Sequence, residues 1–215
     1  MPSWVRAVGN SNPDIYYTDR EGYRDDEYLT LGVDYEPLWN GRTAVDLYTD
    51  MMNALVQEFS SYLGSTIITI EVGLGPAGEL RYPSYQLQQN RWRFPGIGEF
   101  QCYDKYMLNA LKNYANKTGH MEWSHGGPSN AGNYNNKPYE TGFFSNGNKN
   151  GDNWNSDYGK FFLTWYSNML LQHADNVLKS AMIAFKGTGV QLAAKVAGIH
   201  WWYFTDSHAA ELTAG

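Results

Sequence analysis

The chain has 215 residues, of which 42% are hydrophobic and 18% are charged, proportions that are typical of a folded globular protein rather than a disordered one. The formal net charge is −6 and the pI is about 5.3. Because no stripe of Lys and Arg appears, the composition argues against binding to nucleic acid or to an anionic membrane. The single cysteine, Cys102, excludes an internal disulfide.

No apolar run reaches the length of a membrane span, and residues 1–10 lack the apolar core of a secretory signal. The sequence therefore assigns no cellular location. Residues 1–40 show no sustained periodicity, and their mixture of Asn, Asp, Gly and Pro with aromatic residues predicts an ordered, irregular loop that can include short extended pieces.

The first predicted helix begins at Thr43, where apolar residues start to recur at helical spacing. Thr43 and Asp46 resemble a capping box, and Gly64 is a plausible end of the helix. Residues 65–73, "STIITIEVG", are short, β-branched and nearly continuously apolar. They predict a buried parallel strand.

The second half of the chain repeats this order of elements. A second helix is predicted at about residues 98–116, and the polar, Asn- and Gly-rich residues 120–157 predict a long loop. A long third helix is predicted from Ser156, and a second buried strand at about residues 190–197.

Each of the two predicted strands follows a helix and has the continuous apolar character of a parallel strand. This order of elements indicates an α/β protein. Two strands cannot form a stable open sheet by themselves, and an eight-stranded α/β barrel takes about 250 residues. We therefore expect residues 1–215 to be one domain that is an incomplete piece of a larger (β/α)8 barrel.

The most distinctive segment follows the first predicted strand. "GLGPAGELRYPSY", residues 73–85, surrounds one carboxylate, Glu79, with glycines and prolines that bend and restrict the backbone. A rigid loop that holds one carboxylate suits a general acid, which Arg81 could orient. An equally good interpretation is a structural carboxylate that pairs with Arg81. Glu71, inside the strand, could support Glu79 from the barrel interior or form a structural ion pair.

The end of the second predicted strand carries two further candidates. Lys195 could donate to a sugar hydroxyl, and His200 stands beside Trp201 and Trp202, which could stack on a sugar ring. The alternative for His200 is a buried core histidine. Aromatic residues make up 16% of the chain, which fits either sugar-stacking surfaces or an aromatic core.

The remaining polar residues give weaker signals. His208 and Glu211 fit packing and helix-capping roles better than catalysis. His120, His125 and His173 show no ligand spacing, and no metal or phosphate-loop motif is present. No metal site and no cofactor are therefore expected.

The motif "GPAGELRYPSY", residues 75–85, closely resembles the active-site signature of beta-amylases, the family-14 glycoside hydrolases. "FPGIGEFQCYDKY", "GKFFLTWYSNMLLQHAD" and "KVAGIHWWYFTDSHAAELTAG" resemble the same family in the same order, so the resemblance covers nearly the whole chain apart from residues 124–157. The resemblance implies a (β/α)8 barrel that releases maltose from the non-reducing ends of α-1,4-glucans such as starch, with inversion and without a cofactor.

The resemblance also implies roles for individual residues. Glu79 matches the family's general acid, Lys195 and His200 match its substrate-binding lysine and histidine, and Tyr85 and Trp92 match positions that shape sugar subsites. An inverting glycosidase needs a second carboxylate as general base. By the resemblance, that base lies beyond residue 215, and this chain supplies about the fourth and fifth barrel strands with their long loops and helices. The resemblance therefore implies a barrel domain that is incomplete at both ends.

Two functional hypotheses follow. In the first, the chain is part of an exo-acting α-1,4-glucan hydrolase and is inactive alone. In the second, it belongs to a non-catalytic glucan-binding or regulatory beta-amylase-like protein. The intact motif around Glu79 favours the first hypothesis, and the missing base keeps the second open.

Overall fold

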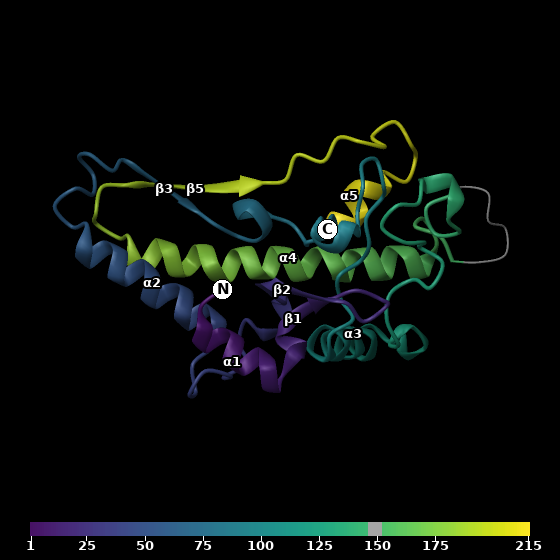
Figure 1. Cartoon of the computed structure of the whole chain (residues 1–215), viewed down its shortest axis with the longest axis horizontal. Coiled ribbons are helices and arrows are strands. Elements are labelled where there is room, and N and C mark those ends of the chain that lie inside the picture. The colour runs from purple at the N-terminus through teal and green to yellow at the C-terminus, as the bar shows by residue number, and fades with distance from the viewer. Residues whose placement is uncertain (146–151) are drawn as a thin grey trace.

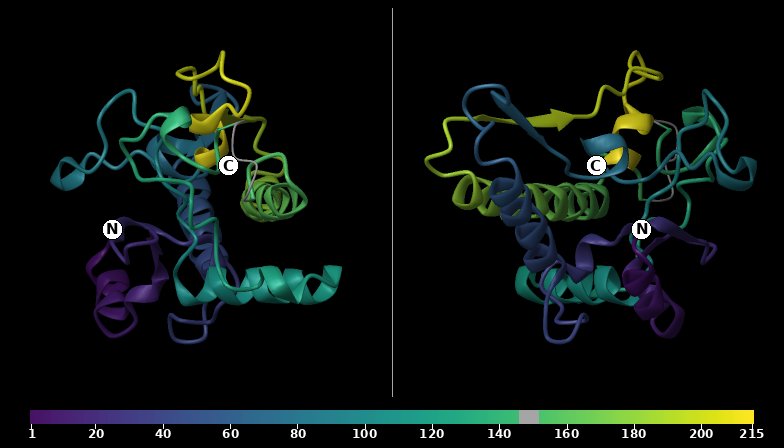
Figure 2. Two further views of the ribbon diagram at one scale, coloured as in Figure 1. Left: turned by 90° about the vertical axis from the view of Figure 1, so that its right-hand side faces the viewer. Right: turned by 60° about the vertical axis from the view of Figure 1, so that its left-hand side comes forward.

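One long helix organises the molecule. The computed structural model describes residues 1–145 and 152–215, and α4, Asp157–Ala184, runs through its middle for 28 residues. The strands β3, Thr69–Val72, and β5, Gln191–Val196, lie along one side of α4, while the N-terminal elements and α3, Lys105–Thr118, lie on the other side (Figures 1 and 2). The helix α4 is therefore the support on which the other elements are arranged.

The N-terminal region is more regular than the sequence predicted. It contains a helix, α1, Ser3–Ser11, and an antiparallel hairpin of β1, Tyr16–Thr18, and β2, Arg24–Leu29. The prediction of an irregular loop over residues 1–40 was wrong for α1, whereas β1 and β2 agree with its short extended pieces. Because α1 is short and has only Val5 and Gly9 fully buried, its helical period is too brief to detect, and packing against neighbouring residues stabilises it.

The helix α2, Ala44–Glu58, confirms the predicted helix and its cap. Thr43 Oγ1 accepts a hydrogen bond from the backbone N–H of Asp46 at 3.2 Å, and the Asp46 carboxylate accepts one from the backbone N–H of Thr43 at 2.9 Å. The helix ends at Glu58, earlier than expected. Gly64 does take a left-handed conformation, with φ of 78°, but it does so in the turn that follows the helix.

The predicted parallel strands are present, and a third short strand joins them. Both β3 and β4, Glu79–Leu80, pair with β5 in parallel. The expectation that the strands are buried was wrong for this chain. Of β3 only Val72 is buried, and no residue of β5 is. One face of the sheet packs on α2 and α4, and the described residues do not cover the other face (Figure 1).

The helix α3 begins at Lys105, later than the predicted residue 98, because Asp104 forms its N-cap. The Asp104 carboxylate accepts hydrogen bonds from the backbone N–H groups of Tyr106 and Met107 at 3.0 and 2.9 Å, and from the Thr30 hydroxyl at 2.8 Å. Residues 98–104 are therefore irregular backbone, and they pass beneath the loop that carries Glu79.

The long loop was predicted correctly for its described part, where only short 3-10 turns interrupt it. Residues 146–151 of that prediction lie outside the described residues. The predicted third helix is α4, and the chain closes with α5, Ala209–Ala214. Among the described residues no helix is both long and apolar enough to cross a membrane.

The buried Asp104 predicts that the stability of this chain depends on pH. Burial raises the pKa of Asp104 to about 7, whereas an unfolded chain has an Asp pKa of about 3.9. The folded state therefore binds this proton more tightly, so the contribution of Asp104 to stability is full below about pH 4 and is lost as the pH rises towards 7. The melting temperature of Asp104→Asn should fall less between pH 5 and pH 8 than that of the wild type.

The matched control is Asp46→Asn at the exposed cap of α2. Hydrogen bonding to the Thr43 backbone lowers the pKa of Asp46, so this group titrates below the pH window and should leave the slope unchanged. Equal slopes for Asp104→Asn and the wild type would contradict the prediction.

Candidate active site

The backbone around Glu79 leaves the sheet and returns to it at one place. Along β5, Ala194 pairs with Val72, and the next residue, Lys195, pairs with Glu79. Residues 73–78 are thus an excursion between two paired positions. A Cβ placed on Gly73 would lie 3.8 Å from the Cα of Gly78, so the two ends of the excursion are close together. This geometry sets the Glu79 side chain at the end of the strands, beside Lys195.

The excursion is held by its own backbone. Gly78 N–H donates to the Gly75 carbonyl at 2.9 Å, and Leu74 N–H donates to the Gly78 carbonyl at 3.1 Å. Ala77 and Gly78 both have positive φ values, 56° and 78°. Glycine adopts such a conformation without steric cost, whereas alanine does so at a cost. The predicted rigid loop is therefore present, and part of its strain falls on Ala77.

The Glu79 carboxylate lies between two cations. Arg81 Nε contacts Glu79 Oε2 at 2.8 Å, and Lys195 Nζ lies 4.0 Å from Glu79 Oε1. Lys195 Nζ also donates to the Ala77 carbonyl at 3.2 Å, which ties β5 to the excursion. The Glu79 side chain is 22% exposed, so the carboxylate is fixed but still accessible. The ion pair with Arg81 is thus present, and it is compatible with both interpretations of Glu79.

A row of side chains extends from Glu79 to His200. The Arg81 guanidinium lies 6.0 Å from the ring centre of Tyr85, which meets Trp201 edge-on at 4.7 Å. Trp201 in turn contacts the ring of His200 at 5.9 Å. His200 is exposed, so the alternative of a buried core histidine was wrong. Sequence positions far apart therefore form one continuous surface of charged and aromatic groups.

Trp92 completes the aromatic part of this surface. Its ring lies 5.3 Å from Tyr85 and 5.5 Å from Trp201. The indole N–H groups of Trp92 and Trp201 both donate to the Gly96 carbonyl, at 2.8 and 2.9 Å. We call Tyr85, Trp92 and Trp201 the aromatic platform.

The platform rests on the segment before α3. The Tyr85 hydroxyl donates to the Ala210 carbonyl of α5, and burial raises the pKa of Tyr85, so it stays a neutral donor. A Cβ on Gly98 would lie 2.6 Å from the Tyr85 ring and 2.7 Å from the Ser84 carbonyl. A residue without a side chain is therefore required at position 98, where the backbone passes directly under the platform.

Sequence analysis did not identify the residue that anchors the Glu79 loop. Tyr82 is fully buried and stacks on Tyr166 of α4, with ring centres 3.7 Å apart and an interplanar angle of 9°. The Tyr82 hydroxyl donates to the Tyr166 carbonyl at 2.8 Å. Tyr82 stands inside the motif at residues 75–85, but nothing in the local sequence indicates that its partner lies in a distant helix.

The weaker candidates behave mainly as structural groups. His208 precedes α5 and contacts the Glu211 carboxylate at 2.7 Å, but its side chain makes no capping hydrogen bond to the backbone of the helix. His173 is buried against Asp34 at 2.8 Å. Glu71 is exposed, and its Oε1 would lie 3.9 Å from a Cβ on Gly78, so its carboxylate is beside the loop that carries Glu79. Its supporting role stays a prediction.

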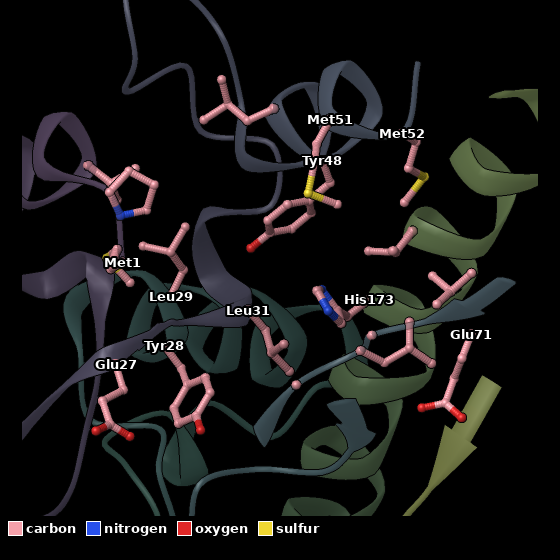
Figure 3. Close-up of a pocket in the computed structure, with 18 of the residues that line it drawn as sticks. Met1, Glu27, Tyr28, Leu29, Leu31, Tyr48, Met51, Met52, Glu71 and His173 are labelled. Carbon is pink, nitrogen blue, oxygen red and sulfur yellow. The ribbon is translucent and has the colours of Figure 1, made fainter. Parts of the chain in front are cut away.

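A separate cavity of about 640 Å³ opens between β2, α2 and β3 (Figure 3). Its walls are mainly apolar and include Leu31, Tyr48, Met51 and Met52, and Glu79 does not line it. Because burying sugar hydroxyls without hydrogen-bond partners is costly, this cavity does not suit a polar glucan. The accessible row from Glu79 to His200 is the better candidate site.

Comparisons with known proteins show what the chain is similar to. The family that matches is Glycosyl hydrolase family 14, over residues 1–215. The chain is 53% identical to "Beta-amylase 1, chloroplastic" of Arabidopsis thaliana over 215 residues, covering 100% of this chain and 37% of that protein. It is 55% identical to "Beta-amylase" of Glycine max over 216 residues, covering 100% of this chain and 42% of that protein. The chain thus spans about two fifths of the length of these relatives.

Among solved structures, the chain matches the catalytic domain of beta-amylase from Paenibacillus polymyxa with a TM-score of 0.76 and 31% identity. The match covers 100% of this chain and 50% of that domain. Together with the parallel strands and their preceding helices, it confirms the expected fold class, an α/β chain that is part of a (β/α)8 barrel.

The backbone of residues 73–78 is packed so tightly that one added methyl group should lower the stability of the chain. A Cβ on Gly75 would lie 2.7 Å from the Glu79 carbonyl and 3.0 Å from the Arg81 carbonyl. Gly75→Ala should therefore lower the free energy of unfolding by about 1–3 kcal/mol, as overpacking does. Urea denaturation of both proteins measures the difference.

The control is Gly198→Ala, because nothing lies within 4 Å of a Cβ at that position. It should change the free energy of unfolding by no more than about 0.5 kcal/mol. Similar losses for the two variants would show that the excursion is not tightly packed.

Proposed function

This chain belongs to glycosyl hydrolase family 14, and on that premise we propose that it carries the general-acid half of a beta-amylase active site. The substrate would be an α-1,4-glucan such as starch, and the product would be maltose released from non-reducing ends with inversion. The observation that carries the proposal is the position of Glu79, an accessible carboxylate fixed between Arg81 and Lys195 at the end of parallel strands.

Glu79 would act on the leaving oxygen. In an inverting hydrolysis, water attacks the anomeric carbon as the bond to the glycosidic oxygen breaks. The proton of Glu79 passes to that oxygen, and a second carboxylate takes the proton of the attacking water. To act as an acid, Glu79 must carry a proton, whereas in this structure its carboxylate forms an ion pair with Arg81. The glucan that binds therefore has to displace Arg81 from the carboxylate.

The second carboxylate would come from outside these 215 residues. Inverting enzymes hold their two carboxyl groups about 6.5–9.5 Å apart, with a water between the base and the sugar. The chain covers about two fifths of its curated relatives, which leaves the larger part of such a protein to supply the base. The reaction needs only two carboxyl groups and water, so the proposal includes no cofactor and no metal in catalysis.

The groups along the row would hold the glucan. Sugar rings present polar hydroxyl edges and flatter apolar faces, so they suit a surface that alternates charged groups with aromatic rings. Lys195 and His200 are exposed and able to bond hydroxyl groups, and the aromatic platform supplies ring faces between Glu79 and His200. Lys195 would serve two purposes, since it also holds the excursion at the Ala77 carbonyl.

The acid role of Glu79 predicts a specific kinetic loss. In the complete enzyme, Glu79→Gln keeps the size of the side chain but removes its proton, so kcat for maltose release from soluble starch should fall at least about 100-fold. The KM should change much less, because the lost interaction belongs to the transition state. A matched control is Glu58→Gln, an exposed glutamate at the end of α2. Near-normal turnover of Glu79→Gln would remove Glu79 from this role.

A general base outside these residues, as proposed, predicts that the 215-residue chain alone releases no maltose. NMR of the product made by the complete enzyme should show the β-anomer first, as inversion requires. β-Maltose from the isolated chain, abolished by Glu79→Gln, would contradict the proposed division of the site. Glucan binding without release by the complete protein would instead support the non-catalytic glucan-binding function.

A further inference from the structure

Two glutamate side chains that are far apart in the sequence meet beside the segment that passes under the aromatic platform. Glu21 lies in the turn between β1 and β2, and Glu99 lies in the segment before α3. The carboxyl groups of Glu21 and Glu99 share a hydrogen bond, and one oxygen of each lies within 4.8 Å of an oxygen of Asp19. Two carboxyl groups can share a hydrogen bond only if one of them carries a proton, so this contact requires a protonated glutamate.

The environment of Glu99 favours its neutral form. Glu99 is only 6% exposed, whereas the side chain of Glu21 is 51% exposed. Glu99 Oε1 accepts a hydrogen bond from the backbone N–H of Tyr134 at 3.0 Å, but Glu99 Oε2 is shielded from solvent and accepts no hydrogen bond from the described residues. A buried carboxylate oxygen without a donor is costly, whereas a neutral carboxyl group can donate its O–H to the Glu21 carboxylate. The proton therefore belongs on Glu99.

The other groups around Glu99 do not neutralise it. The charged and titratable side chains that face it come from the turn after β1, from residue 91, from the segment before α3 and from the loop after α3: Asp19, Arg20, Glu21, Arg91, Tyr103 and Tyr134. Arg20 contacts Glu21 Oε1 at 3.1 Å, and Arg91 lies 3.7 Å from Asp19 Oδ2. Among the described residues, two cations thus face three carboxyl groups, and neither of these ion pairs includes Glu99.

The pKa values of these groups agree with that geometry. Burial, followed by the hydrogen bond and the charge of Glu21, raises the pKa of Glu99 to about 8. Burial alone would also raise the pKa of Glu21, but the hydrogen bond with Glu99 and the contact with Arg20 lower it. Burial raises the pKa of Tyr103 and of Tyr134, so both phenols stay neutral. At neutral pH the pair of glutamates therefore holds one proton.

From this geometry we propose that Glu21 and Glu99 share one proton and together form a pH-sensitive support that keeps the segment before α3 in place under the aromatic platform. While the proton is present, the O–H of Glu99 donates to the Glu21 carboxylate. As the pH rises, the proton passes to water and leaves two adjacent anions, so the contact becomes repulsive. A glutamate in an opened chain has a pKa of about 4.3. The support is therefore complete below about pH 4 and is lost as the pH rises to about 8.

The repulsion would act on the segment before α3 rather than on the turn after β1. Arg20 fastens this turn to the loop after α3, because it donates to the Ser129 carbonyl at 2.6 Å and to the Gly132 carbonyl at 3.0 Å. These two bonds do not depend on the proton of Glu99. The turn is therefore the fixed side of the contact, and Glu99 is the side that moves.

A movement of Glu99 would reach the aromatic platform through the backbone. Glu99 N–H donates to the Ser84 carbonyl at 3.3 Å, in the loop that follows Glu79. The neighbouring Gly98 packs so closely that a Cβ on it would lie 2.6 Å from the Tyr85 ring. The support thus acts on the structure of the platform, and it is independent of whether Glu79 acts as a general acid.

The test is hydrogen exchange of the 215-residue chain, followed by NMR at the backbone N–H groups of Gly98 and Glu99 and corrected for the intrinsic dependence of exchange on pH. Protection from exchange reports the free energy of local opening. Because opening exposes Glu99, the protection factors of these two groups should fall by about tenfold per pH unit between pH 6 and pH 8, and should be constant above about pH 8. Protection that is independent of pH in the wild type would overturn the proposal.

Two variants distinguish a shared proton from burial alone. Glu99→Gln keeps a neutral side chain of the same size, so its protection factors should not depend on pH. Glu21→Gln removes the charge that raises the pKa of Glu99, so protection should become constant at a lower pH than in the wild type. The matched control is Glu122→Gln, an exposed glutamate outside the pair, which should keep the wild-type profile.

Carbon-13 NMR of the glutamate carboxyl groups gives a second measurement that leaves Glu99 unchanged. One carboxyl resonance should titrate near pH 8 in the wild type and at a lower pH in Glu21→Gln. Because the side chain of Glu21 is exposed, this variant should fold, and it decides the question if Glu99→Gln does not fold. A wild-type profile in Glu99→Gln, or an unchanged titration in Glu21→Gln, would overturn the proposal.

Discussion

The stacking of Tyr82 on Tyr166 is the contact on which the candidate site depends. Both rings are buried, and the hydroxyl group of Tyr166 reaches beyond the pair. The Tyr166 hydroxyl donates to the Thr213 carbonyl at 3.1 Å and accepts from the backbone N–H of Gln101 at 3.0 Å. One aromatic pair therefore joins the loop after Glu79, the segment before α3, the helix α4 and the helix α5. Burial raises the pKa of both tyrosines, so they stay neutral donors.

Because α4 is long and well packed, this contact gives the loop a rigid support. The excursion at residues 73–78 is then fixed at both ends, by strand pairing with β5 on one side and by Tyr82 on the other. Glu79 stands between these two anchors. A short, strained backbone and two flanking cations can thus hold one carboxylate still while leaving part of it open to solvent, which is what catalytic positioning requires.

The sequence predicted the longer helices and the two parallel strands, and it missed the N-terminal helix α1. The capping box at Thr43 and the apolar periods of α2 and α4 are repeated local signals, so they were readable without a structure. The helix α1 and the hairpin of β1 and β2 are too short to show a period. The start of α3 was placed too early because the apolar residues before Asp104 pack into the core without being helical.

The sequence by itself determined the family resemblance, the special backbone around Glu79, and the candidacy of Lys195 and His200. These features depend only on the types of neighbouring residues, so they can be identified without a structure. Only the tertiary structure decided that Lys195 lies beside Glu79, that His200 is exposed at the end of an aromatic row, and that Tyr82 stacks on Tyr166. The physical reason is that these contacts join residues far apart in the chain, and the packing of α4 and the register of β5 bring them together.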